Sequence, residues 1–146
     1  NYKCTIRTVS DKLNTLNNNR PLYNSATKAI FESGPLSSQS DEIIYKAVNN
    51  YLEAVIAIFK LSNDPTAKIT KNILFKVFML QFNDIAEKCK SKFNNLKTDS
   101  FVEYMHPLTE LQYKEYTGTN KATEARISED IKSALREKME FDGDIF

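Results

Sequence analysis

The chain has 146 residues, of which 41% are apolar and 27% are charged, with 20 basic and 19 acidic residues. A chain of this length can bury a core without a metal or dense disulfides, and its composition excludes the disordered and fibrous classes. The charge is uneven: residues 1–97 carry fourteen basic and eight acidic side chains, and residues 98–146 carry six and eleven. This asymmetry favours pairing between the two halves over steering of a charged partner.

Two short helices are predicted at the start of the chain. Residues 5–16 place apolar side chains at helical spacing, and Asn17–Asn19 with Arg20-Pro21 should stop that helix. Residues 22–31 suggest a second helix, which the loop signal Ser33-Gly34-Pro35 should end.

The strongest apolar pattern lies in residues 47–61 and 69–93. A long helix should begin after Ser40, because serine caps helix N-termini and Asp41 and Glu42 favour the first turn. Asp64 is expected to cap the next helix, with Pro65 at its first position. Together the two stretches predict a tight, central antiparallel hairpin that is hydrophobic on more than one side.

Pro107 is expected to split residues 98–116 into two short helices. Thr117 to Asn120 should break the chain again before a last amphipathic helix with a charged outer face, from Ala125 to Lys138. The predicted fold is therefore all-α: a single compact bundle of five to seven helices over residues 1–146.

No motif of an active site, metal site or nucleotide loop is present. Gly34, Gly118 and Gly143 are isolated, which excludes the familiar glycine-rich phosphate loops. His106 is the single histidine, and it cannot form a zinc site with two distant cysteines. A nucleophilic pair of Cys89 with His106 lacks any supporting motif. We therefore expect no cofactor and no enzymatic activity.

The two cysteines, Cys4 and Cys89, are predicted to form a disulfide, which would stabilise the fold by about 4–5 kcal/mol in the chain-entropy model. The alternative is two buried thiols in a reducing compartment.

A first residue that is asparagine, not methionine, fits a chain that has lost a signal peptide. A secreted or cell-surface protein is the leading expectation, with a cytoplasmic one as the alternative.

Two sets of residues are candidate binding sites. Lysines near Phe93 suit the negative end of a helix, and they also suggest a contact with an anionic surface; their low charge density disfavours nucleic acid. The surplus of large apolar residues in the hairpin suggests ordinary core, a ligand cavity or a partner groove. The lysines are Lys88, Lys90, Lys92 and Lys97, and the candidate cavity residues are Tyr51, Phe59, Phe75, Phe78, Met79 and Phe82.

The leading functional hypothesis is a non-enzymatic, exported interaction domain that binds a protein partner through its surface. The alternative is an apolar-ligand carrier or a membrane-interacting bundle, because the hairpin is hydrophobic on two sides. An enzyme is the third class, since an active site without a known motif can occur on any fold. The sequence does not predict the oligomeric state.

Overall fold

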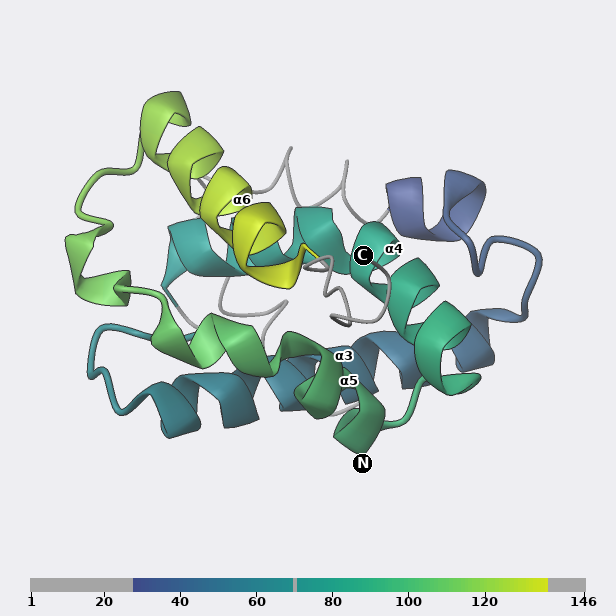
Figure 1. Cartoon of the computed structure of the whole chain (residues 1–146). Helices are drawn as coiled ribbons and strands as arrows, with labels where there is room; N and C mark the ends of the chain where they lie inside the picture. The colour runs from purple at the N-terminus through teal and green to yellow at the C-terminus, as the bar shows by residue number, and fades with distance from the viewer. Residues whose placement is uncertain (1–27, 70, 137–146) are drawn as a thin grey trace, which may run out of the picture.

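The computed structural model describes residues 28–69 and 71–136, and the elements in these ranges are helices without a strand (Figure 1). The all-α prediction is therefore confirmed for the described chain. The predicted helix over residues 5–16 and most of residues 22–31 lie outside the described residues. In chain order, the elements are η1 (Ala29–Ser33), α3 (Asp41–Ser62), α4 (Asn72–Phe93), α5 (Thr98–Met105), η2 (His106–Glu110), η3 (Tyr113–Glu115) and α6 (Lys121–Leu135).

The ends of the long helices follow local sequence signals. The Ser40 hydroxyl accepts a hydrogen bond from the Ile43 backbone N–H at 3.4 Å, as expected for the N-cap of α3. Asn63 and Asn94 end α3 and α4 in the left-handed conformation, with φ of 54° and 58°. Asparagine tolerates this conformation better than most residues, so both helices can end at a single left-handed residue without a glycine.

The predicted start of α4 was wrong. Asp64 does not cap that helix; its Oδ1 accepts the Thr66 N–H at 2.9 Å and the Thr66 hydroxyl at 2.6 Å, which closes a local turn. Its Oδ2 accepts the Lys114 backbone N–H at 3.1 Å. Residues 63–69 therefore form no helix, α4 begins at Asn72, and Asp64 instead ties the α3–α4 loop to η3.

The break at Pro107 is confirmed. α5 ends at Met105, and the chain continues as the short 3₁₀ helix η2 with Pro107 in its first turn. Asn120 then caps α6, because its side-chain oxygen accepts the Thr123 N–H at 3.0 Å. α6 ends at Leu135, three residues before the predicted end, and Lys138 lies outside the described residues.

α5 and η2 lie along α3, while α6 lies against α4 and η2 (Figure 1). The Asn50 side chain joins α3 to the segment before α5 by donating to the Leu96 carbonyl at 3.0 Å. α3 and α4 meet chiefly through side chains, whereas the backbone of α3 lies closer to α5. The tight α3–α4 hairpin and the total of five to seven helices stay predictions.

The centre of the core is aromatic. The fully buried ring of Tyr51 packs edge-to-face against Phe82 and Phe101, with centroids 5.1 and 5.5 Å apart. The Tyr51 hydroxyl donates to the Phe78 carbonyl at 2.6 Å, so its polar end is satisfied without water. This cluster joins α3, α4 and α5.

A second aromatic cluster joins α3 and α4 to the segment before α6. The Phe59 ring packs edge-to-face against Phe78 at 5.3 Å and against Tyr113 at 5.1 Å. Tyr113 also contacts Tyr116, at 6.1 Å, and donates its hydroxyl to the Leu108 carbonyl at 2.7 Å. The irregular segment after α5 is thus fixed by buried tyrosines.

Gly34 makes a close approach that predicts a measurable effect of mutation. A Cβ at this buried position would overlap the Asn83 side-chain amide, which donates to the Ala29 carbonyl at 3.3 Å and so joins α4 to η1. We expect Gly34→Ala to force Asn83 to rotate away and to lower the free energy of unfolding by about 1–3 kcal/mol. Urea denaturation would measure this.

The matched control is Gly34→Ala combined with Asn83→Ala. The double variant should lose less than the sum of the two single changes, because the overlap is absent. Additive losses would show that Gly34 and Asn83 do not interact.

Candidate binding groove between α4 and α6

α6 attaches to α4 through few residues. Its buried side chains are Ile127 and Ile131, both with no exposed surface. Two polar contacts flank them: Lys76 Nζ lies 2.7 Å from Glu124 Oε1, and Gln81 Nε2 donates to Ser128 Oγ at 2.8 Å. The paired residues advance together along both helices, so α4 and α6 run in the same direction.

Beyond the contact of Gln81 with Ser128, the two helices enclose a groove of about 480 Å³, which we call the α4–α6 groove. Ile85 and Ile131 are almost fully buried and form its floor, while the half-buried Tyr104 of α5 and Leu135 of α6 contribute apolar wall. All lining residues are Gln81, Asp84, Ile85, Glu87, Lys88, Tyr104, Ile131, Lys132, Leu135 and Arg136.

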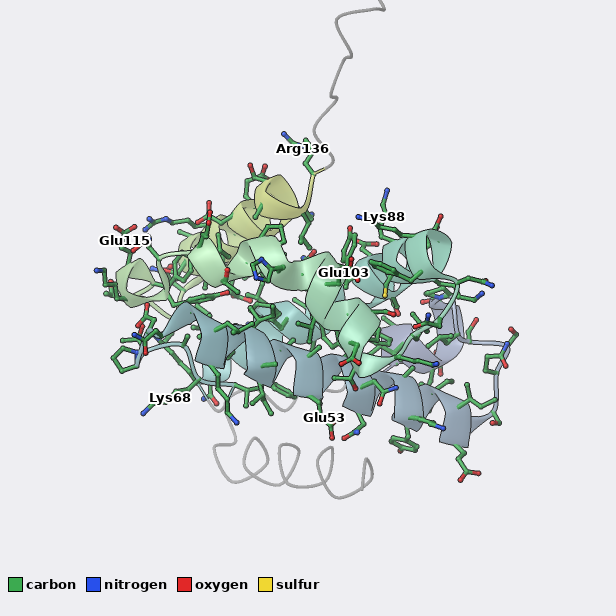
Figure 2. The ribbon with its side chains drawn as sticks, turned by 60° about the horizontal axis from the view of Figure 1, so that its bottom comes forward. Glu53, Lys68, Lys88, Glu103, Glu115 and Arg136 are labelled. Carbon is green, nitrogen blue, oxygen red and sulfur yellow. The ribbon has the colours of Figure 1, made fainter. Side chains whose placement is uncertain are left out.

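The rim of the α4–α6 groove is charged. Lys88 comes from α4, and Lys132 and Arg136 come from the end of α6. None of these cations takes part in the ion pairs of Lys28 with Glu32, Lys76 with Glu124 or Arg126 with Glu115. Lys88 and Arg136 extend from the same edge of the molecule (Figure 2). The α4 wall also carries Asp84 and Glu87, whereas the charges on the α6 wall are all positive.

Two other grooves meet at the α3–α4 turn. One, of about 400 Å³, is formed entirely within residues 56–69, and the other, of about 250 Å³, lies between the same turn and residues 109–114. Both share Asn63, Asp64 and Pro65. Since the first is formed by the end of α3 and the turn that follows it, and the second by turn and irregular segments, the larger α4–α6 groove, built on three helices, is the better candidate site.

The four candidate lysines are all exposed but do not form one patch. Lys88 and Lys92 are one helical turn apart on α4, whereas Lys90 lies between them on another face. Lys90 donates to Asn94 Oδ1 at 2.5 Å, Lys92 lies 5.6 Å from the centre of the Phe93 ring, and Lys97 precedes α5. Only Lys88 of the four lines a described groove.

The six candidate cavity residues are buried, with 0 to 6% of their surface exposed. Four of them pack ring against ring in the two aromatic clusters. Among the three grooves, only that of residues 56–69 touches any of the six, at Phe59. An apolar ligand cavity at these positions stays a prediction that no described groove supports.

Cys89 and His106 occupy contrasting environments. Cys89 is buried with its Sγ 3.7 Å from the Asn95 carbonyl, and as a thiol it has a pKa that burial raises to about 11. A nucleophilic cysteine needs a lowered pKa, so this environment opposes that role. His106 is exposed at the start of η2. Cys4 lies outside the described residues, so the disulfide stays a prediction.

A polar network around Tyr116 was not predicted from the sequence. The Tyr116 hydroxyl donates to Asp130 Oδ2 at 2.6 Å, its carbonyl accepts from Lys71 Nζ at 3.0 Å, and the Arg126 guanidinium stacks 5.4 Å from its ring. Arg126 also donates to Glu115 Oε2 at 3.0 Å. Burial and the hydrogen bond to Asp130 raise the Tyr116 pKa well above its usual value. Tyr116 is thus held neutral as a donor that anchors α6.

These raised pKa values predict loss of stability in alkali. Burial raises the pKa of Tyr51, Tyr113 and Tyr116 as well as that of Cys89. In the unfolded chain these groups ionise at about pH 8.5–10. Their contribution is therefore complete below that range and is lost as the pH rises toward the folded pKa values. Urea midpoints should be level near neutral pH and fall above about pH 9.

Tyr116→Phe is the control for the alkaline effect. It removes one of the titrating groups, so we expect a shallower fall of the urea midpoint above about pH 9, even though the lost bond to Asp130 lowers stability at neutral pH. An unchanged slope would show that Tyr116 ionises equally readily in both states.

The described residues contain no group of three or more His, Cys, Asp or Glu side chains that could hold a metal ion. None of the helices in residues 28–69 and 71–136 is both long and apolar enough to cross a membrane. Comparison of the chain with protein-family models, curated protein sequences and solved structures finds no significant match.

Proposed function

We propose that this protein is a helical interaction domain that binds a segment of a partner protein in the α4–α6 groove. The observation that carries the proposal is the combination of apolar surface at the half-buried Tyr104 and Leu135, supported from below by the buried Ile85 and Ile131, with a rim of three cations outside the described ion pairs. An apolar floor supplies affinity and a polar rim supplies orientation, as in known protein-binding grooves.

The shape of the site supports a peptide as the ligand. α4 lines the groove from Gln81 to Lys88, about two helical turns. A helix laid in such a groove places side chains at i, i+3 or i+4 and i+7 on the floor. The proposal assigns no catalytic step to the protein.

Selection of peptides from a displayed random library against the full-length chain tests this function. Selected peptides should shift the backbone amide NMR signals of α4 and α6 near Ile85, Ile131 and Leu135. They should lose affinity when Leu135→Gln makes the wall polar. Shifts confined to other surfaces, or affinity unchanged by Leu135→Gln, would overturn the proposal.

The predictions that the protein is exported, and that Cys4 and Cys89 are bonded, form part of this proposal. Within a single compact bundle of five to seven helices around an α3–α4 hairpin, such a bridge would link the start of the chain to α4. Intact mass spectrometry under non-reducing conditions, with and without prior reduction and alkylation, tests it. Two alkylated cysteines without reduction, in the denatured protein, would exclude the bridge.

A further inference from the structure

We infer that the partner segment is an amphipathic helix with an acidic flank that faces α6. This inference rests on the proposed function and names the chemistry of its ligand. It follows from the unequal charges on the two walls of the α4–α6 groove.

The charged side chains on the α6 wall are all basic. Lys132 lies in the last turn of α6 and Arg136 is the residue directly after the helix, and both line the groove beside the apolar side chain of Leu135. Cations near a helix C-terminus are favourable for the helix itself. That effect still leaves both groups without an ion pair to a described carboxylate. A ligand with carboxylates could form ion pairs with both cations.

The α4 wall has the opposite balance. It carries two anions, Asp84 and Glu87, and one cation, Lys88. A ligand with carboxylates on both flanks would therefore meet repulsion along α4. The complementary ligand has carboxylates only toward α6 and a neutral or basic flank toward α4, which also fixes its orientation.

The groove suits a helix better than an extended strand. Its walls are helices, and the described chain offers no sheet edge to which a strand could add. The part-buried contact of Gln81 with Ser128 closes one end, so the ligand helix enters from the end where Lys88 and Arg136 extend (Figure 2). Apolar side chains on one stripe would then pack against Tyr104 and Leu135, above the buried Ile85 and Ile131.

Two synthetic helical peptides of about three turns test the inference against the full-length chain. Both carry the same leucine stripe; one has glutamates on a single flank, and the other has lysines at the same positions. Fluorescence anisotropy should show tighter binding of the glutamate peptide, and this preference should shrink with added salt.

Charge reversal identifies the wall responsible. Lys132→Glu and Arg136→Glu should each weaken the glutamate peptide by about tenfold and strengthen the lysine peptide. Lys68→Glu is the matched control, because Lys68 is exposed on the opposite edge of the molecule (Figure 2) and should change neither affinity. Circular dichroism would confirm that all three variants keep their helices.

The outcomes separate the inference from the proposed function. Equal binding of both peptides, weakened by Leu135→Gln but not by charge reversal, would overturn the acidic ligand and leave a groove that binds peptides. No binding of either peptide, while library peptides map to the groove, would also overturn only the inference.

Binding to phosphatidylserine vesicles that is lost in Lys132→Glu would replace the peptide by a lipid surface. Displacement of the glutamate peptide by a synthetic copy of residues 137–146 would assign the groove to this chain's own segment.

Discussion

Replacing Phe82 by alanine should lower the free energy of unfolding by about 3–5 kcal/mol, the range typical of a phenylalanine removed from a closed core. Phe82 has no exposed surface, and its ring lies 5.1 Å from Tyr51 and 6.5 Å from Phe101. Its loss would leave a cavity where α3, α4 and α5 meet. Urea denaturation followed by circular dichroism would measure the change.

Leu80→Ala is the control, because Leu80 lies two residues away on the same helix with 45% of its surface exposed. We expect it to cost less than about 1 kcal/mol. Phe82→Leu, which retains most of the volume, should fall between the two. Equal losses in Phe82→Ala and Leu80→Ala would show that the aromatic cluster is not the structural centre of the protein.

The features that the sequence predicted correctly depend on residues close together in the chain. Ser40 caps α3 through Ile43, three positions away, and Pro107 ends α5 because a proline lacks the donor that a continuing helix needs. The end of α4 at Asn94 is equally local. In each case the interaction that decides the structure lies within one helical turn.

The features that the sequence did not predict depend on contacts between residues far apart in the chain. Asp64 was predicted to cap a helix, but its second oxygen binds the Lys114 N–H, fifty positions away, and this contact holds the α3–α4 loop outside the helix. The α4–α6 groove was missed for the same reason. Its register is set by pairs such as Gln81 with Ser128, 47 positions apart, and helical periodicity carries no information about which neighbour a helix will choose.

The lysines also could not be grouped correctly from the sequence. Lys88, Lys90 and Lys92 are close in sequence, and this suggested one patch around Phe93. Helical geometry instead separates Lys90 from the other two, while the fold places Lys88 at a groove with Lys132 and Arg136. The grouping that matters for binding was thus spread over two helices.

Replacing Ile127 by alanine should detach α6 from α4 before the rest of the protein unfolds. Ile127 and Ile131 are the buried residues of α6, and truncating a buried isoleucine costs about 2–5 kcal/mol. Ile131 then remains the one fully buried apolar contact of α6 in the described chain. The polar contacts of Lys76 with Glu124, Gln81 with Ser128 and Tyr116 with Asp130 are only partly buried, so they compensate for little of the loss. Hydrogen exchange should therefore accelerate in α6 while α3 and the core of α4 stay protected.

Ile127→Val is the matched control for this change. It removes one methyl group, should cost about 0.5–1.5 kcal/mol, and should leave most of the α6 protection in place. Since Ile127 does not line the α4–α6 groove, any loss of peptide affinity in Ile127→Ala must come from the displaced α6 wall. Uniform acceleration of exchange over all helices would show instead that α6 unfolds only with the whole bundle. Selective acceleration together with lost affinity would show that binding depends on how firmly α6 is held against α4.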